Sequence, residues 1–210
     1  MPHRGSGLGR RRVTLVALLL LLAPGLVAGS RGSGFQGQVL DPPRPALDFT
    51  LTDQSNRSVH LASLHGQVVV LTFLYTTCVD ACPLVAAKLH EVTELLGSRR
   101  AAVAVVAVTV DPERDTPAAM TEFSRRWAML DRWRFLTGTE RQLETIWQYY
   151  WAGHVRREIP GATATAKPSH AIGHGSPVHV FDRAGRIRVV YDADFKPADL
   201  THDIETLLEQ

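Results

Sequence analysis

The sequence predicts an α/β fold in which a central mixed β-sheet is flanked by helices. Two apolar, β-branched runs, residues 68–75 and 101–110, have the composition of buried parallel strands. A segment with apolar residues at helical spacing follows each run. Two short strand-like runs separated by a turn, 178–181 and 186–191, come near the end of the chain. The order β–α–β–α–β–α–β–β–α is typical of a sheet covered by helices.

Residues 1–29 differ in kind from the rest of the chain. Their only charged residues are four arginines: Arg4, Arg10, Arg11 and Arg12. An apolar run over 13–27 and the small residues at 28–30 follow, as in an export signal. The run is shorter than the ~20 residues of a membrane span. We therefore expect either a cleaved signal peptide or an uncleaved membrane anchor. The arginines also resemble a twin-arginine signal, and a mitochondrial presequence is a third option.

The charge of the exported part argues against a nucleic-acid partner. Without the four arginines, 19 of the 23 Lys and Arg remain against 21 Asp and Glu, so this part is slightly acidic. It has no basic patch interleaved with aromatic residues. We expect an extracytoplasmic location, in the periplasm or on the outer face of the cytoplasmic membrane. An uncleaved N-terminal segment would tether the protein to that membrane.

The remainder is expected to be one domain behind a flexible linker. Residues 30–46 are rich in Gly and Ser and then in Pro, so the linker is assigned to them. The domain is assigned to 47–210, and it begins with a β extension of two short strands, 47–51 and 58–61. The segment 154–177 has little periodicity and several Gly and Pro, which favours a functional loop.

The later helices have clear start signals. Thr116 and Pro117 begin one helix, and a short strand is expected over 133–137. Thr139 and Gln142 form the pattern of a capping box before the next helix. The last helix is expected over 197–208.

Both cysteines of the chain, Cys78 and Cys82, lie between the first core strand and a helix. Pro83 and a helical stripe follow: Val85, Leu89, Val92 and Leu96. A helix N-terminus favours thiolate over thiol. The pair could close a disulfide or bind one soft metal ion. A purely structural disulfide is the alternative, although so small a loop removes little chain entropy. Cys78, in the loop, is expected to be the more exposed thiol.

The histidines fall into two groups. We expect solvated side chains for His60, His65, His90 and His202. A second group lies around the last hairpin and is a source of candidate ligands: His170, His174 and His179.

Three stretches of the chain together form a pattern typical of one protein family. Residues 73–83 read FLYTTCVDACP, with two cysteines three residues apart and a following proline. Residues 108–117 read VTVDPERDTP, and residues 174–185 read HGSPVHVFDRAG. The sequence resembles the SCO/SenC family of copper-binding, thioredoxin-like proteins that help assemble cytochrome c oxidase. Val79 after the first cysteine and Gly173 before His174 depart from the common family pattern, which has proline and an acidic residue there.

The resemblance implies a thioredoxin-like fold and a copper site of two thiolates and one imidazole, Cys78, Cys82 and His174. Such sulfur and nitrogen ligands suit Cu(I), and the resemblance implies that Cu(II) is bound as well. His174 is preferred because His170 lies further out in the loop and His179 lies within a strand. With Val178 and Val180 facing the core, His179 is expected to point to the opposite face of the sheet. Asp111 and Asp115 are expected to shape the loop near the site, since carboxylates suit harder ions.

The function implied is that of a copper chaperone for the CuA centre. Its expected partner is the oxidase subunit carrying that centre. A thioredoxin-like reductant, as a source of electrons, or another copper chaperone, as a source of copper, is a further candidate partner. The alternative is an enzyme, a thiol–disulfide oxidoreductase in which Cys78 and Cys82 are a redox-active dithiol. A peroxiredoxin-like peroxidase is disfavoured because Leu71 and Tyr75 stand where such enzymes carry Pro and Thr. The cysteine count and spacing exclude a c-type haem or a four-cysteine zinc site.

Overall fold

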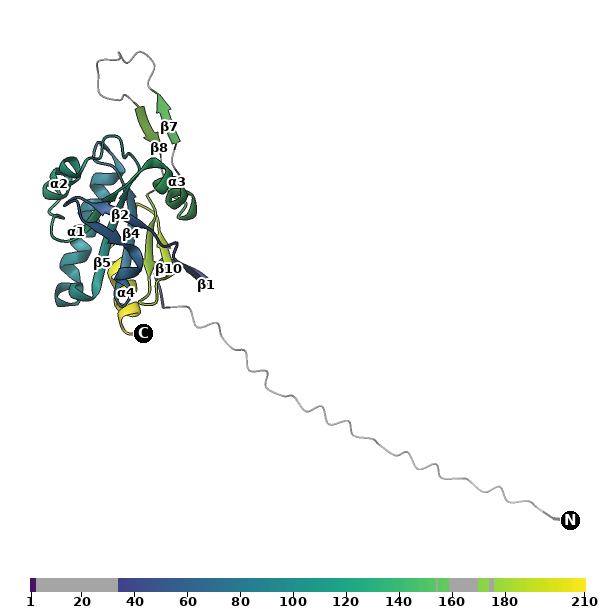
Figure 1. Cartoon of the computed structure of the whole chain (residues 1–210). Coiled ribbons are helices and arrows are strands. Elements are labelled where there is room, and N and C mark those ends of the chain that lie inside the picture. The colour runs from purple at the N-terminus through teal and green to yellow at the C-terminus, as the bar shows by residue number, and fades with distance from the viewer. Residues whose placement is uncertain (3–33, 154, 159–169, 174–175) are drawn as a thin grey trace. The chain divides into compact units, whose positions relative to one another are not determined.

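An eight-stranded mixed sheet with helices on both faces organises the domain (Figure 1). The computed structural model describes residues 1–2, 34–153, 155–158, 170–173 and 176–210. Residues 32–210 form one compact unit, distinct from residues 1–31. The strands are β1 (Gln38–Pro45), β2 (Thr50–Asp53), β3 (Ser58–His60), β4 (Val68–Leu74), β5 (Val103–Thr109), β6 (Arg134–Thr137), β7 (Val155–Glu158), β8 (His170–Gly173), β9 (Val178–Phe181) and β10 (Arg186–Tyr191). The α-helices are α1 (Ala81–Leu95), α2 (Pro117–Arg126), α3 (Glu140–Tyr149) and α4 (Pro197–Leu208).

Three parallel strands form the centre of the sheet. The strand order is β1-β10-β9-β4-β5-β6-β2-β3, and β4, β5 and β6 run parallel. All residues of β4 and β5 are buried, as expected of apolar strands covered on both faces. The flanking strands are antiparallel to their neighbours. The predicted α/β class, with a central mixed sheet flanked by helices, is confirmed.

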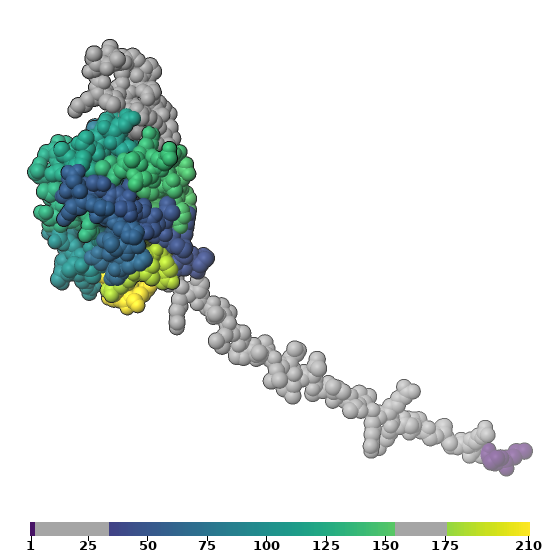
Figure 2. Space-filling model, viewed as in Figure 1, coloured from purple at the N-terminus to yellow at the C-terminus, as the bar shows by residue number. Residues whose placement is uncertain are grey.

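Alternate residues of the central strands feed two separate cores. One core packs the sheet against α1, α2 and α4 and includes Val70, Val105 and Leu89. The other packs it against α3 and the short 3-10 helix Leu61–Leu64 and includes Leu71 and Val106. The period of two along each strand therefore divides the side chains of the sheet between its two helical layers. On the face shown in Figure 2, the blue surface of β2–β3 adjoins the teal and green surface of later elements.

Several predicted helix boundaries are confirmed. The last helix, α4, spans 197–208 as expected. Thr116 caps α2 by accepting a hydrogen bond from the N–H of Ala119, and Pro117 begins the helix. The capping box of Thr139 and Gln142 is formed at the start of α3. These local signals succeed because each is a contact between near neighbours in the sequence.

The first strand lies within the stretch 30–46 that was expected to be a linker. β1 pairs with β10 at the edge of the sheet. The N–H groups of Gln36 and Gly37 donate to the buried carboxylate of Asp203 in α4. Proline is tolerated in β1 because an edge strand need not donate every N–H. Gly and Pro content alone did not reveal this long-range pairing.

The segment 154–177 contains strands that its sequence did not predict. β7 and β8 pair antiparallel in a two-stranded sheet of their own. Residues 154, 159–169 and 174–175 of the segment, and so His174, lie outside the described residues.

The predicted N-terminal signal or anchor, 1–29, also lies outside the described residues apart from positions 1–2. Within the part of the chain that the structure describes, no helix is long and apolar enough to cross a bilayer.

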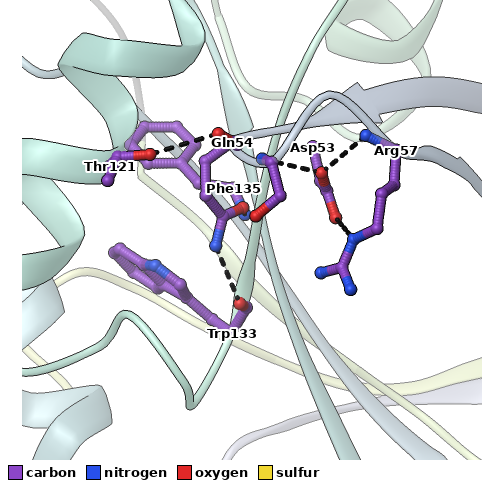
Figure 3. A network of polar contacts seen from close by, with 7 residues as sticks. Asp53, Gln54, Arg57, Thr121, Trp133 and Phe135 are labelled. Atoms are coloured by element: carbon purple, nitrogen blue, oxygen red, sulfur yellow. Dashed lines mark hydrogen bonds and ion pairs between the residues drawn. The ribbon is translucent and has the colours of Figure 1, made fainter.

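A polar network joins the turn of the β2–β3 hairpin to β6 and α2 (Figure 3). The Gln54 side chain donates to the carbonyl of Trp133 and accepts from the N–H of Phe135. Within the turn, the Asp53 carboxylate accepts from the N–H groups of Ser55 and Arg57. The β extension is thereby attached to the core sheet by buried hydrogen bonds as well as by strand pairing.

Candidate functional site

The dithiol lies where β4 ends and α1 begins. Cys78 is in the connecting loop, and Cys82 is in the first turn of α1. Asp80, at the N-cap, makes no side-chain capping bond. Instead, the N–H of Cys82 donates to Sγ of Cys78, with the two atoms 3.4 Å apart. The sulfur of Cys78 therefore takes the place of a capping oxygen, at a helix end that favours negative charge.

The two thiols have different environments. They are not joined by a disulfide; Cys78 is half-buried, whereas Cys82 is 0% exposed. The hydrogen bond with Cys78 and then burial raise the pKa of the Cys82 thiol. Cys82 therefore keeps its proton more strongly than an ordinary cysteine. The expectation that Cys78 is the more exposed thiol is confirmed.

Tyr75 lies against the dithiol and was not identified from the sequence as part of the site. Its carbonyl accepts a hydrogen bond from the N–H of Cys78. Burial and then the neighbouring Cys78 raise the pKa of the Tyr75 hydroxyl. From the sequence, Tyr75 was noted only as the end of the apolar run 68–75 and as the residue that stands where a peroxiredoxin-like enzyme carries Thr. The hydroxyl stays protonated, so Tyr75 is a neutral neighbour of the two sulfurs.

A buried carboxylate underlies the dithiol loop. Asp115 is 0% exposed, and its Oδ1 accepts from both the N–H and the hydroxyl of Thr76, at 3.0 and 2.6 Å. Its Oδ2 accepts from the hydroxyl of Thr109, the last residue of β5. Burial raises the pKa of Asp115 to about 6, although these hydrogen bonds oppose the rise. Asp115 thus joins the loop after β4 to the end of β5.

Asp111 lies with Asp115 in the loop between β5 and α2 but has a different role. It forms an ion pair with Arg114, and its N–H donates to the Thr109 hydroxyl. Both aspartates therefore hold the loop 110–116, as the sequence led us to expect. Thr76 and Thr109 were not identified, because a threonine hydroxyl gives no sequence signal for its partner.

The first group of histidines is only partly as predicted. His60, His65 and His202 are exposed, and His60 contacts the carboxylate of Asp48. His90 is instead half-buried, and its Nδ1 is buried without a hydrogen-bond partner among the described residues. The expectation of a solvated His90 was wrong, because the Nδ1 side of its ring is buried.

Of the three candidate histidines, the structure describes the side chain of His179 alone. As expected, it lies on the sheet face opposite Val178 and Val180. That face is covered as well, so His179 is 0% exposed, and its Nε2 donates to the carbonyl of Tyr150 at 2.9 Å. Burial lowers the pKa of His179 to about 4, so the ring is neutral at pH 7.

The predicted three-residue metal site is described only in part. The two thiols of Cys78 and Cys82 are brought together at the start of α1, and His174 is outside the described residues. Among the residues that are described, no three His, Cys, Asp or Glu side chains gather as a metal site would require.

The fold and the site together define a thioredoxin-like domain with a dithiol at the start of its first long helix. The SCO1/SenC family model matches residues 39–209, and the chain belongs to that family. An SCO2-like protein of Rickettsia conorii is 27% identical over 153 residues, which are 73% of this chain and 72% of the relative. Protein SenC of Rhodobacter capsulatus is 27% identical over 161 residues, which are 77% and 69% of the two chains.

Solved structures of similar proteins share the architecture. Apo Sco1 of Thermus thermophilus has a TM-score of 0.70 and 26% identity, and the match covers 82% of this chain and 96% of that one. ScoI of Bradyrhizobium japonicum, solved with copper bound, has a TM-score of 0.67 and 25% identity, with 78% and 99% covered.

Proposed function

We propose that this protein is a copper chaperone that acts in cytochrome c oxidase assembly and delivers copper to the CuA centre. The observation that carries the proposal is the pair of thiols, Cys78 and Cys82, held in contact at the start of α1. The ScoI protein of Bradyrhizobium japonicum, which has the same fold, has been solved with copper bound. The cargo is copper, as Cu(I) and as Cu(II).

The donor set suits a soft metal ion. Thiolate sulfur is a preferred ligand of Cu(I), and carboxylate oxygen suits harder ions. The nearby carboxylates of Asp111 and Asp115 are occupied by an ion pair and by hydrogen bonds within the protein. The N–H of Cys82 donates to the Cys78 sulfur, which stabilises a thiolate there. Because the thiols must lose their protons, copper affinity is expected to fall as the pH drops.

We assign the third ligand to His174. β9 is antiparallel to β4, and Leu71 pairs with His179, so β9 begins at the end of the sheet where β4 ends. The chain just before Val178 therefore approaches the dithiol end of the sheet. This topology supports a ligand a few residues before β9, and the buried, hydrogen-bonded ring of His179 argues against that residue.

Three variants test the assignment. His174→Ala should lose Cu(II) binding and weaken Cu(I) binding, while Cys78 and Cys82 still form a disulfide. His170→Ala and His179→Ala should leave copper binding near the wild-type level. Competition with a chromophoric chelator measures the affinity. Loss of copper in His170→Ala with retention in His174→Ala would reassign the ligand.

The same proposal places the protein outside the cytoplasm, with residues 1–29 as a signal peptide or membrane anchor. Its partner is the oxidase subunit that carries CuA. Outside the cytosol a dithiol oxidises unless it is kept reduced. A thioredoxin-like reductant or another copper chaperone is therefore the expected upstream partner.

A thiol–disulfide oxidoreductase is the second candidate, and the difference in exposure between the two thiols favours it. A half-exposed Cys78 beside a buried Cys82 is suited to attack on a partner's disulfide followed by resolution. Metal content and thiol state of the protein isolated from its native compartment separate the two functions. About one copper per chain with reduced thiols supports the chaperone. A metal-free disulfide that turns over with a partner protein supports the oxidoreductase.

A further inference from the structure

We propose that Asp115 is a positioning residue that fixes the Cys78 sulfur at the start of α1 and thereby sets the copper affinity and redox equilibrium of the dithiol. The copper part of this inference rests on the proposed function. The redox part depends only on the two thiols.

The contacts of the loop 75–78 give the first argument. Thr76 directs both its N–H and its hydroxyl to one oxygen of Asp115. At the far end of the loop, the Cys78 sulfur accepts the N–H of Cys82. Between them, the N–H of Cys78 donates to the carbonyl of Tyr75. The loop is therefore held at one end by Asp115 and at the other by α1.

The electrostatics of Asp115 give the second argument. Within the described parts of the chain, no Lys, Arg or His side chain forms an ion pair with this carboxylate. Burying a carboxylate without a cationic partner is unfavourable, and both of its oxygens accept hydrogen bonds from the protein. Such an arrangement is poorly explained by global stability alone. It is well explained by the need to hold two loops at one site.

The position relative to the ligands gives the third argument. Thr76 is two residues before Cys78, so Asp115 acts on the sulfur through a single intervening residue. Groups that orient metal ligands typically change metal affinity by about 10–100-fold when removed. Release of Thr76 would let Cys78 leave its place above the N–H of Cys82.

Asp203 provides a matched control. Like Asp115, it is 0% exposed and accepts three hydrogen bonds, here from the N–H groups of Gln36 at 2.8 Å and Gly37 at 3.0 Å and from the hydroxyl of Tyr191. It lies on α4 and holds residues 36–37, just before β1, and not the dithiol loop. A loss of stability without a loop effect is thus expected from Asp203→Ala.

The experiment compares Asp115→Ala, Asp115→Asn and Asp203→Ala. Cu(I) affinity is measured by chelator competition, and stability by denaturant unfolding. We expect Asp115→Ala to weaken Cu(I) binding by about 10–100-fold. Asp115→Asn, which keeps an acceptor for Thr76, should retain most of the affinity. Asp203→Ala should lose stability with unchanged affinity.

A copper-free readout separates this inference from the proposed function. Oxidised glutathione converts the two thiols to a disulfide and yields two reduced glutathione molecules. Two thiols held beside each other have a higher effective concentration for disulfide formation, so Asp115→Ala should lower that equilibrium constant by about tenfold. If the wild-type protein bound no copper, this measurement would still test whether Asp115 positions the dithiol. Equal copper and glutathione results for Asp115→Ala and Asp203→Ala would overturn the proposal.

Discussion

The two hairpin turns and the dithiol loop all use an aspartate to hold backbone N–H groups, but in opposite electrostatic settings. Asp53 accepts from the N–H groups two and four residues later and from the Nε of Arg57. Asp182 repeats this pattern with Ala184 and Arg186. Asp115 also accepts a hydrogen bond from a backbone N–H, yet among the described residues no arginine forms an ion pair with it.

The pKa values follow this difference. Burial opposes ionisation at Asp53 and Asp182, but the hydrogen bonds of their turns and the arginines outweigh it and lower both pKa values. At Asp115 burial outweighs the hydrogen bonds and raises the pKa to about 6. The turns are thus stabilised by their charge, whereas the dithiol loop keeps its carboxylate at a cost in stability. Carboxylates whose pKa is strongly perturbed, as that of Asp115 is by burial, cluster at functional sites.

The largest effect is expected at the dithiol itself. Cys78→Ser or Cys82→Ser should weaken Cu(I) binding by about 1,000-fold or more, since losing a soft ligand removes about 4 kcal/mol or more. Asp182→Asn, at a hairpin turn, should leave Cu(I) affinity unchanged. Chelator competition on the three variants checks this contrast. Retained affinity in either cysteine variant would show that copper binds elsewhere.

The second effect concerns the pH dependence of stability. The pKa of Asp115 is raised from 3.8 to about 6, so its ionisation disfavours the folded state by up to about 3 kcal/mol above pH 6. That penalty appears as the pH rises from about 4 to about 6. Asp115→Asn should therefore unfold at higher denaturant concentration than the wild type at pH 7, with the advantage vanishing near pH 4. A variant less stable at pH 7 would contradict the electrostatic assignment.

The sequence predicted those features that depend on near neighbours or on strand composition. The apolar runs that became β4 and β5, the capping box at Thr139 and the bounds of α4 are examples. The position of both cysteines at a strand-to-helix junction was predicted for the same reason.

Features that depend on distant partners were not predicted. β1 was assigned to a linker because its pairing with β10 spans most of the chain. The contact between Asp115 and Thr76 joins residues 39 positions apart. His179 was placed on the correct sheet face, but only packing shows that Tyr150 and Trp151 cover it.

A third effect is expected at the hairpin turns. Asp53→Asn and Asp182→Asn should each lower the free energy of unfolding by about 1–2 kcal/mol at pH 7. The amide can replace one oxygen as acceptor, but its NH₂ group then faces the arginine Nε, which is also a donor. Because the pKa of each carboxylate is lowered on folding, its stabilisation is present above the unfolded value of 3.8 and is lost as the pH falls. Denaturant unfolding at pH 7 and at pH 3 measures the loss of stability and its pH dependence. Variants as stable as the wild type at pH 7 would remove the contrast with Asp115.

The smallest effect is expected from the arginine of the β2–β3 turn. Arg57 has a side chain that is 71% exposed, and it contacts Asp53 through one bond at 3.0 Å. Exposed ion pairs contribute about 0.2–1 kcal/mol because water screens them and ordering a long side chain is unfavourable. The backbone N–H groups of Ser55 and Arg57 remain in Arg57→Gln, so the turn keeps its main hydrogen bonds. Arg57→Gln should therefore lower the free energy of unfolding by about 0.5 kcal/mol or less, clearly below Asp53→Asn. Parallel denaturant titrations of the two variants compare them. An equal loss would show that the arginine, and not the backbone, holds the turn carboxylate, and would make the missing cation at Asp115 the decisive difference between the two regions.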